Sequence, residues 1–400
     1  MKKIIQNRIL QLCCILVTLL LIACENDDMN KPVITGVRNY APSPNDSVLQ
    51  SLQPGQWVTL VGHNLTEATQ IIISGVPVPF NKSLFSDTYA VVQVPAIIPF
   101  PVIPADKLNT IQYFTKGGST TFSFEITVPA PTITAISNEN ANAGDMVSIL
   151  GTNLFLLTKL SYAGIEITEY TTSNDGTTVS FILPELNGSG PVVVENKSGA
   201  YTTLYNVNDP TGMLCNFDDV NTLSWGPSVS NSSTTFPSNR GNYAILRNNG
   251  LSANNSSWWE GDRGLNTNGV QWVPVDSLNV PVDEYAVKFE INVPGKWNGT
   301  SLYILKDYNW NYLARFEPWD LGNGKTTVVS TNGYWVTVTI PFTLFRKNNG
   351  KGTVPPAGLK DVLGDSGSGS FHIYTINDSS APTTTAFNIA IDNIRVVKIK

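Results

Sequence analysis

The sequence predicts an all-β protein built from consecutive antiparallel sandwiches, and three observations support this fold class. Apolar and polar residues alternate in short runs, for example at 58–61, 122–126 and 335–340. Gly, Pro, Asn, Ser and Thr interrupt the chain so often that no amphipathic helix of three turns can be drawn. The chain also contains a repeat, which is followed by a segment of different composition. Period-two runs at this spacing are typical of β-sandwiches.

Residues 1–23 have the pattern of an export signal. Three basic residues open the segment, and an apolar run follows that is too short to span a bilayer. The run ends in Leu-Ile-Ala before Cys24, which resembles the lipobox of bacterial lipoprotein signal peptides, where the cysteine thiol carries the lipid. We therefore expect cleavage after residue 23 and lipidation of Cys24. An uncleaved N-terminal helix is the alternative.

The residues after Cys24 indicate where the chain resides. Residues 24–30 form a linker that begins Cys-Glu-Asn-Asp-Asp. This acidic cluster resembles the signal that sends Bacteroidetes lipoproteins to the outer face of the outer membrane. We expect a lipid-anchored, cell-surface protein. The formal net charge of −6 becomes more negative once the signal is removed, which argues against a nucleic-acid partner. Cys215 is then the one remaining thiol besides Cys24, so we expect no internal disulfide.

Two stretches, 54–65 and 143–154, align at an offset of 89 residues. Both carry Gly-x-x-Val-x-Leu or its equivalent, followed by Gly-x-Asn-Leu, in which a turn residue tolerates positive φ. The pattern resembles IPT/TIG domains, which are small immunoglobulin-like sandwiches. The resemblance implies two tandem domains, 31–130 and 131–208, that serve as spacers or interaction modules.

The repeat stops near residue 209, and eight of the nine tryptophans lie in 209–400. A segment of this length fits one larger jelly-roll-like sandwich. Its opening residues 214–219 and closing residues 389–396 are similar to the terminal strands of carbohydrate-binding jelly rolls, which commonly pair with each other. We therefore expect a carbohydrate-binding β-sandwich at 209–400.

Tryptophan is suited to sugar recognition because the apolar face of a pyranose stacks on an indole ring, while its hydroxyls need polar partners. Burial in the core is the ordinary alternative for any single tryptophan. Trp297 follows Pro-Gly-Lys and precedes Asn-Gly, which is typical of a loop. Trp310 lies in an equally polar turn. We expect both side chains to face a ligand.

Trp335 opens a strand in which Val336, Val338 and Ile340 share one face. Because these aliphatic side chains belong in the core, Trp335 is expected on the opposite face, beside two threonines. That face can serve as a sugar platform, and a sheet end covered by a loop explains the pattern equally well.

The remaining tryptophans divide between the two interpretations. Trp258 and Trp259 cannot both point inward from one strand, so we expect one to be exposed. Trp319 follows a proline at a strand end and fits either role, whereas Trp272 between apolar residues is expected in the core. The predicted glycan-binding residues are thus Trp297, Trp310, Trp335, Trp319, Trp258 and Trp259.

Catalytic and metal-binding motifs have less support. The chain has two histidines, His63 in a repeat turn where the second copy has Thr, and His372 in a strand. No nucleophile elbow precedes a helix, and one free Cys cannot close a zinc site. We expect no catalytic residue, no metal and no cofactor.

Two alternatives stay open. A glycosidase could use two carboxylates among Asp262, Glu290, Glu317 and Asp320. A calcium ion could bind near the paired termini at Asp218, Asp219 and Asp392.

The order of lipobox, acidic cluster, two IPT/TIG-like repeats and a Trp-rich terminal sandwich resembles the surface glycan-binding proteins of Bacteroidetes polysaccharide-utilisation systems. The resemblance implies a non-catalytic protein that captures a β-glucan, such as xyloglucan or mixed-linkage glucan, beside a SusCD-like importer and a surface glycanase. A surface endo-glycanase and an adhesin or protein-interaction module are the alternatives. The sequence does not name the polysaccharide.

Overall fold

The computed structural model describes residues 31–383 and 385–400, and the chain divides into two compact units with the boundary between Pro129 and Ala130. The predicted signal segment 1–23, the lipidation site Cys24 and the linker 24–30 lie outside the described residues. In the part of the chain that is described, helices are too short or too polar to cross a membrane.

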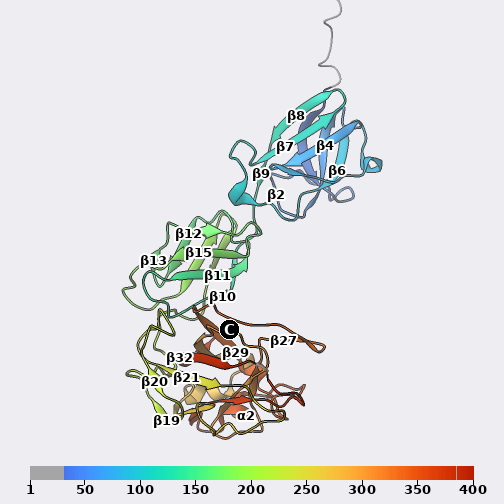
Figure 1. Ribbon diagram of the computed structural model, residues 1–400. Helices are drawn as coiled ribbons and strands as arrows, with labels where there is room; N and C mark the ends of the chain where they lie inside the picture. The colour runs from blue at the N-terminus through green and yellow to red at the C-terminus, as the bar shows by residue number, and fades with distance from the viewer. Residues whose placement is uncertain (1–30, 384) are drawn as a thin grey trace, which may run out of the picture. The chain divides into compact units, whose positions relative to one another are not determined.

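The first unit is an immunoglobulin-like sandwich (Figure 1). One sheet has the order β1-β3-β6, and the other has the order β5-β4-β7-β8, with a parallel β2-β9 pair beside them. The strands are β1 (Val33–Asn39), β2 (Ser51–Leu52), β3 (Trp57–His63), β4 (Ala68–Ile73), β5 (Val76–Pro77), β6 (Tyr89–Gln93), β7 (Thr110–Thr115), β8 (Gly118–Ser123) and β9 (Glu125–Ile126). Two 3₁₀ turns, η2 (Lys82–Leu84) and η3 (Phe100–Val102), lie in its loops.

The second immunoglobulin-like sandwich opens the second unit. Its sheets have the orders β10-β11-β15-β14 and β13-β12-β16-β17. The strands are β10 (Thr132–Ile136), β11 (Met146–Thr152), β12 (Lys159–Tyr162), β13 (Ile165–Glu166), β14 (Thr171–Thr172), β15 (Thr178–Ile182), β16 (Val192–Asn196) and β17 (Gly199–Thr202). Burial alternates along β11 as it does along β3, because one face of each strand packs into the core.

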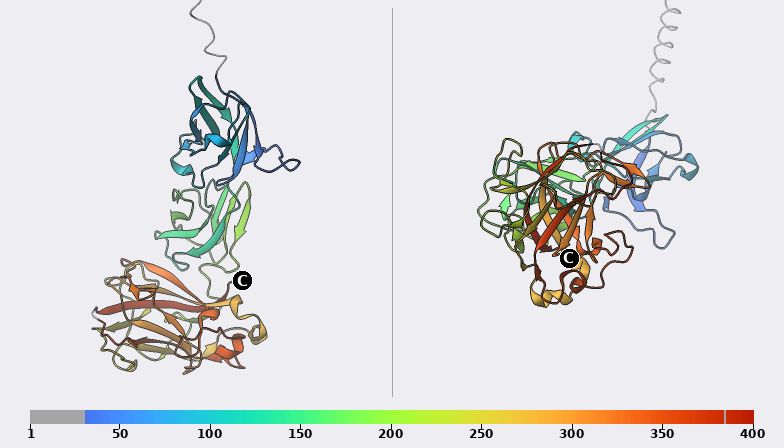
Figure 2. Two further views of the ribbon diagram at one scale, coloured as in Figure 1. Left: turned by 90° about the vertical axis from the view of Figure 1, so that its right-hand side faces the viewer. Right: turned by 60° about the horizontal axis from the view of Figure 1, so that its bottom comes forward.

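The C-terminal domain is a larger sandwich of two sheets, shown in yellow to red from two further sides in Figure 2. The first, which we name the β24 sheet, has the order β20-β21-β32-β24-β29, and β18 also pairs with β32. Its strands are β18 (Met213–Cys215), β20 (Val229–Ser230), β21 (Tyr243–Asn248), β24 (Tyr285–Asn292), β29 (Trp335–Pro341) and β32 (Phe387–Lys398). The pairing of β18 with β32 confirms the expected contact between the first and last strands.

The second sheet, which we name the β31 sheet, has the order β19-β22-β31-β25-β26. Its strands are β19 (Leu223–Trp225), β22 (Gly264–Thr267), β25 (Ser301–Lys306), β26 (Ala314–Phe316) and β31 (Phe371–Ile376). Two short pairs accompany the sheets, β23 (Val270–Gln271) with β30 (Ser368–Gly369) and β27 (Asp320–Gly322) with β28 (Lys325–Thr326). Short helical turns are η4 (Val275–Asn279), η5 (Val282–Glu284), η6 (Phe342–Leu344) and α2 (Leu359–Leu363).

The inner faces of the two sheets form the core, with Phe289 and Ile291 of β24 opposite Ile304 and Ile373 of the β31 sheet. These observations confirm the predicted fold class, an all-β chain with two tandem immunoglobulin-like sandwiches and a larger jelly-roll-like sandwich.

The outer face of the β24 sheet is covered by the second immunoglobulin-like domain. The backbone N–H of Thr337 donates to Ser137 O over 2.7 Å, and the N–H of Glu139 donates to the Thr337 hydroxyl over 2.8 Å. Lys288 and Glu290, which point outward from β24, are therefore buried. The β31 sheet turns its own outer face away from this contact, because the two sheets pack face to face.

Candidate functional site

The outer face of the β31 sheet carries a cluster of aromatic side chains, which we name the aromatic platform. It consists of Trp225, Trp258, Trp259, Tyr308, Trp310 and Tyr374. Tyr374 lies on β31 and points outward because its neighbours Phe371 and Ile373 fill the core on the other face. The other members come from β19 and from the loops that precede β22 and follow β25.

Tyr374 is the centre around which the platform is stacked. The Trp258 ring lies 4.0 Å from the Tyr374 ring, centroid to centroid, and the Trp310 ring lies 5.8 Å away, both nearly parallel to it. Trp225 and Trp259 meet Trp258 edge-on at 5.8 and 5.6 Å. Such contacts fix the rings in place while leaving the outer ones open to solvent.

Hydrogen bonds hold the platform from below. The Tyr374 hydroxyl donates to Asn266 Oδ1 over 2.9 Å and lies 2.8 Å from His372 Nδ1, while Asn266 Nδ2 donates to the Tyr308 hydroxyl over 3.2 Å. His372 Nε2 lies 2.7 Å from the hydroxyl of Ser370. Burial lowers the pKa of His372 to about 4. The imidazole is therefore neutral at physiological pH, with one ring nitrogen donating and the other accepting.

Polar and charged groups border the platform on β25 and β26. Arg315 pairs with Glu317 at 2.5 Å and with Asp378 at 2.9 Å, and Lys351 also reaches Asp378 at 2.7 Å. The Tyr303 hydroxyl donates to Asp378 Oδ2 over 3.0 Å. These ion pairs hold the pKa of Asp378 well below its usual range, despite partial burial, so its carboxylate stays ionised. Such groups can hydrogen-bond the hydroxyls of a ligand that lies on the rings.

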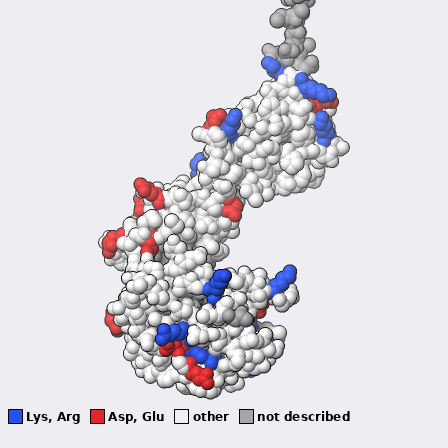
Figure 3. Space-filling model, viewed as in Figure 1, with Lys and Arg blue, Asp and Glu red and all other residues white. Residues whose placement is uncertain are grey.

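Charged side chains are sparse on the face of the molecule shown in Figure 3, in agreement with a charged content of 14%. The low charge over this face gives little electrostatic steering to an anionic ligand.

Three of the predicted glycan-binding tryptophans lie in the platform. Trp310 is 37% exposed and Trp259 is 57% exposed, whereas Trp258 is partly buried between its neighbours. The expectations that Trp310 faces solvent and that one of Trp258 and Trp259 is exposed are confirmed. Their contact with a ligand stays a prediction.

The expected exposure of Trp297 is wrong, because this side chain is only 2% exposed. Its indole N–H donates to Thr300 O over 2.6 Å, and its ring packs edge-on against Phe316 and Phe387. A loop sequence surrounds Trp297, but the loop folds inward over the end of the core.

Trp335 lies on the predicted face of β29, opposite Val338 and Ile340, yet it is 7% exposed. The loop that contains Phe236 and Pro237 covers it, and its indole N–H donates to Pro237 O over 3.0 Å. The prediction of an open sugar platform at Trp335 is therefore wrong, and the alternative, a sheet end under a loop, is correct.

Trp319 and Trp272 contribute to structure. Trp319 is partly buried against the core, and its indole N–H donates to Thr300 O over 3.0 Å. Trp272 is buried as expected, and its indole N–H donates to Gly369 O over 3.0 Å.

Four further residues complete the site and were missed from the sequence: Trp225, Tyr308, Tyr374 and Asn266. Tyr308 could have been found, because it belongs to the same polar turn as Trp310. Tyr374 could also have been found, because it lies two residues after His372 on the face of β31 opposite Phe371 and Ile373. Trp225 and Asn266 carry no local signal.

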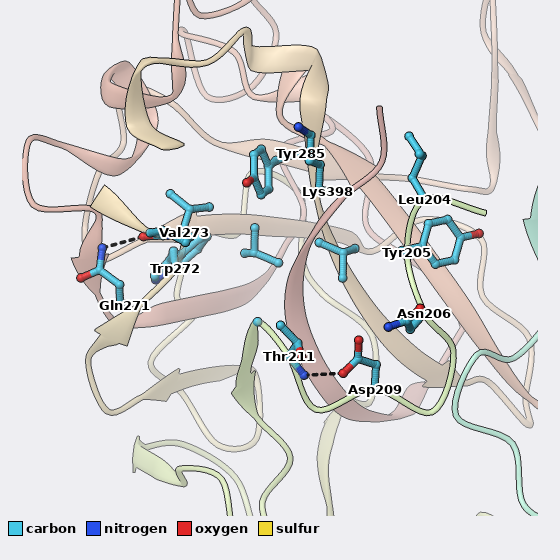
Figure 4. Close-up of a pocket in the computed structure, with 14 residues that line it drawn as sticks. Leu204, Tyr205, Asn206, Asp209, Thr211, Gln271, Trp272, Val273, Tyr285 and Lys398 are labelled. Carbon is cyan, nitrogen blue, oxygen red and sulfur yellow. Dashed lines mark hydrogen bonds between the residues drawn. The ribbon is translucent and has the colours of Figure 1, made fainter. Parts of the chain in front are cut away.

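A separate cavity of about 430 Å³ lies between the second immunoglobulin-like domain and the C-terminal domain (Figure 4). Leu204, Tyr205 and Asn206 form one wall, and Trp272 and Val273 face them. Its polar groups are largely bonded within the protein, since Thr211 N donates to Asp209 over 2.9 Å and Gln271 Nε2 donates to Val273 O over 2.7 Å. The cavity holds no member of the aromatic platform.

The carboxylates considered for glycoside hydrolysis are engaged elsewhere. Glu290 is buried in contact with Arg395, which leaves it inaccessible to a substrate. Asp262 pairs with Arg247 at 2.5 Å, Glu317 binds Arg315, and Asp320 caps the β27–β28 turn by accepting from Gly322 N.

The proposed calcium ligands do not converge. Asp218 accepts from Asn242 N, and Asp219 accepts from Asn216 Nδ2. Across 31–383 and 385–400, no three His, Cys, Asp or Glu side chains are grouped to hold a metal ion.

Comparison with known proteins identifies what this chain is similar to. Residues 207–398 match the family model described as the surface glycan-binding protein B xyloglucan binding domain. A Bacteroides ovatus protein named IPT/TIG domain-containing protein is 23% identical over 377 residues, with 88% of this chain and 71% of the relative covered.

Two solved structures share the fold. The surface glycan-binding protein PbSGBP-B from Prevotella bryantii superposes with a TM-score of 0.65 at 22% identity, covering 92% of this chain and 99% of that one. An SGBP-B from a complex xyloglucan utilization locus in Bacteroides uniformis gives a TM-score of 0.54 at 19% identity, with the same coverage of 92% and 99%. The resemblance predicted from the sequence is confirmed by these matches.

Proposed function

We propose that this chain, whose C-terminal domain is of the surface glycan-binding protein B type, captures polysaccharide on the aromatic platform of that domain without cleaving it. The observation that carries the proposal is the group of exposed rings on the outer face of the β31 sheet, stacked around Tyr374 and bordered by ion-paired polar residues.

The proposed mechanism is reversible stacking. Trp259 and Trp310 offer open ring faces to the apolar faces of successive sugars, and the groups around Arg315 and Asp378 bind hydroxyls at the edge. Each stacked sugar contributes a modest increment, so we expect a dissociation constant between micromolar and millimolar, or about −4 to −8 kcal/mol. Tyr374, on which Trp258 and Trp310 stack, is held by hydrogen bonds with Asn266 and His372, so we expect little ordering of this stack on binding.

The proposed ligand is xyloglucan, since the matching family model is described by that ligand and the Bacteroides uniformis relative comes from a xyloglucan utilization locus. Mixed-linkage glucan is the next candidate among β-glucans. We further propose that Cys24 anchors the chain to the outer membrane, that the IPT/TIG-like domains 31–130 and 131–208 act as spacers, and that a SusCD-like importer and a surface glycanase are its neighbours.

The test is affinity gel electrophoresis and calorimetry with soluble xyloglucan, mixed-linkage glucan, mannan and xylan. We expect retardation by xyloglucan, and a loss of at least about tenfold in affinity for Trp259→Ala and Trp310→Ala, in keeping with about 1.4 kcal/mol per decade. Trp57→Ala is the matched control, because Trp57 is also an exposed tryptophan but lies in the first unit. Release of reducing ends from any of the polysaccharides would instead identify an enzyme. Retardation by none of them would favour an adhesin.

A further inference from the structure

A second groove lies where the second immunoglobulin-like domain meets the β24 sheet, and its volume is about 430 Å³. We name it the Tyr334 groove. Tyr334, which precedes β29, lines one side, and Met146 and Ile182, paired residues of β11 and β15, line the other. The floor includes Ser137, Asn138 and Asp145 from the immunoglobulin-like domain. The backbone contact between Thr337 and Ser137 fixes the two domains together at this point.

The Tyr334 ring is free to bind. It is 68% exposed, whereas the next residue, Trp335, is buried although it also lines the groove. Met146 and Ile182 are exposed as well. A flexible thioether and an aliphatic side chain opposite an open aromatic ring can hold a flat ring between them.

Polar groups in the groove keep unused hydrogen-bonding capacity. Asn138 is nine-tenths buried, and its Oδ1 accepts from Asn140 N over 3.0 Å. Within the described residues its Nδ2 has no hydrogen-bond partner. This unpaired nitrogen keeps access to solvent at the wall of the groove. The Ser137 hydroxyl accepts from Ser148 N, and one Asp145 carboxylate oxygen accepts from Asn142 N, which leaves the Ser137 hydroxyl proton and the second Asp145 oxygen for a ligand.

We propose that the Tyr334 groove is a second saccharide-binding site, with one sugar of a polysaccharide stacked on Tyr334 and its hydroxyls bonded to Asn138 and Asp145. The chemistry matches a neutral, hydroxyl-rich ring: one open aromatic face, one amide donor and one carboxylate acceptor. The lining has no Lys or Arg, which removes the groups that an anionic ligand would need. This inference rests on the proposed function, because it assigns the same class of ligand to a second place.

The two sites lie on opposite sides of the C-terminal sandwich, since the platform is on the outer face of the β31 sheet and the groove is beside the outer face of the β24 sheet. Facing sheets pack about 10 Å apart, and the outer faces lie farther apart than that. A short oligosaccharide therefore fills one site at a time, whereas a polymer long enough to pass around the edge of the sandwich reaches both. Two-site engagement of a polymer raises its apparent affinity without a new contact at either site.

The experiment uses the full chain with xyloglucan polymer and with a short xyloglucan oligosaccharide. Tyr334→Ala removes the ring, and Asn138→Asp removes the amide donor while keeping the oxygen that caps Asn140. Tyr201→Ala, an exposed tyrosine on β17 that is not part of the groove, is the matched control. Each variant is also combined with the platform substitutions Trp259→Ala and Trp310→Ala, and thermal melting verifies that the variants fold.

We expect Tyr334→Ala and Asn138→Asp to weaken polymer binding about threefold to tenfold and to leave the tightest oligosaccharide binding unchanged. In the platform-deficient background, the residual binding of polymer should disappear with Tyr334→Ala and persist with Tyr201→Ala. If Tyr334→Ala and Tyr201→Ala bind the polymer with equal affinity in both backgrounds, the groove is not a saccharide site, and the proposed platform is unaffected. If the platform substitutions have no effect while Tyr334→Ala abolishes binding, the groove is the site and the proposed platform fails. If the unaltered chain binds neither probe, both proposals fail.

Discussion

Trp297 and Trp310 lie in similar polar sequences but have opposite surroundings. Trp297 is enclosed by Phe316 and Phe387, whereas Trp310 rests on Tyr374 with one face open. Truncation of a buried tryptophan removes its packing and leaves a cavity. We expect Trp297→Ala to lower the free energy of unfolding by about 3–5 kcal/mol, and Trp310→Ala to change it by less than about 1 kcal/mol. Urea unfolding of both variants measures the difference, and equal costs would contradict the assigned surroundings.

Residue-level exposure was predictable only where the local sequence decides it. Turn residues around Trp310 indicate exposure. For Trp258 and Trp259 the expected outcome was right but its reason was not, because the pair lies in a turn before β22 and not on a strand. Trp297 has similar turn residues on both sides, but the ring is buried by Phe387, which is 90 positions later in the chain. No local pattern contains that partner.

Asp392 on β32 should make stability depend on pH. Burial, with a contribution from the nearby negative charges of Glu290 and Asp218, raises its pKa to about 9. Between the ordinary carboxyl pKa of about 4 and this value, the folded chain holds a proton that the unfolded chain has lost, so stability falls as pH rises. The loss is about 1.4 kcal/mol per pH unit over that window.

The variant Asp392→Asn keeps the oxygen that accepts from Asn393 N and needs no proton. We expect it to be more stable than the unaltered chain at pH 8, with the gap closing toward pH 5. Urea unfolding at both pH values is the measurement. A gap that does not depend on pH would show that Asp392 is ionised in the folded chain.

At the scale of elements, the repeated Gly-x-Asn-Leu motif has two separate physical causes. Asn64 and Asn153 have φ of 59° and 55°, which confirms the expected tolerance of positive φ. The preceding glycines, Gly62 and Gly151, serve a different purpose. A Cβ on Gly151 would lie 1.8 Å from Thr132 O, and Gly62 has the same contact with Val33 O. The glycine lets the first strand cross close to the second beside a register shift in both copies.

Gly151→Ala should therefore displace β10 from β11. The added methyl group meets backbone rather than a flexible side chain, so we expect a loss of several kcal/mol in the stability of the second unit. Gly188→Ala in the same domain is the control, because a Cβ there meets no atom within 4 Å. Hydrogen exchange of the β10 amides reports the displacement directly. Unchanged protection of these amides in Gly151→Ala would disprove the close approach.

The strand β29 shows which features of an element could be predicted from the sequence. Alternation correctly placed Val338 and Ile340 in the core and Trp335 on the other face. It could not indicate that this face is covered by the loop at Phe236 and by residues near Ser137, because coverage depends on segments far away in the chain. Trp335 is excluded from the candidate site for the same reason: the outer face of the β24 sheet is covered, whereas that of the β31 sheet carries the aromatic platform.

At the scale of the whole second unit, a buried charge cluster joins the second immunoglobulin-like domain to the C-terminal domain. Glu139 of the former accepts from Lys288 Nζ at 2.5 Å and from Arg395 Nη2 at 2.8 Å. Arg395 also binds Glu290 at 2.8 Å, and Lys288 Nζ lies 3.3 Å from the centre of the Tyr205 ring. Two carboxylates balance two cations in a region closed to solvent. The partners are 149 and 256 residues apart, so no repeat, motif or periodicity could indicate them.

This balance predicts that the two domains unfold together. Removing the charge of Glu139 leaves Lys288 and Arg395 with one carboxylate between them, and an uncompensated buried charge typically costs about 3–5 kcal/mol. We expect Glu139→Gln to destabilise residues 130–400 by about that amount and to split one cooperative transition into two. Differential scanning calorimetry of the full chain resolves the transitions.

Glu185→Gln, at an exposed position of the same domain, is the matched control and should leave the profile unchanged. The opposite outcome is that the second immunoglobulin-like domain of the unaltered chain melts separately and that Glu139→Gln does not change the profile. In that case the charge cluster does not join the two domains. If coupling is observed, the second immunoglobulin-like domain does more than the proposed spacing, because it covers one sheet of the C-terminal domain and leaves the aromatic platform on the opposite sheet uncovered.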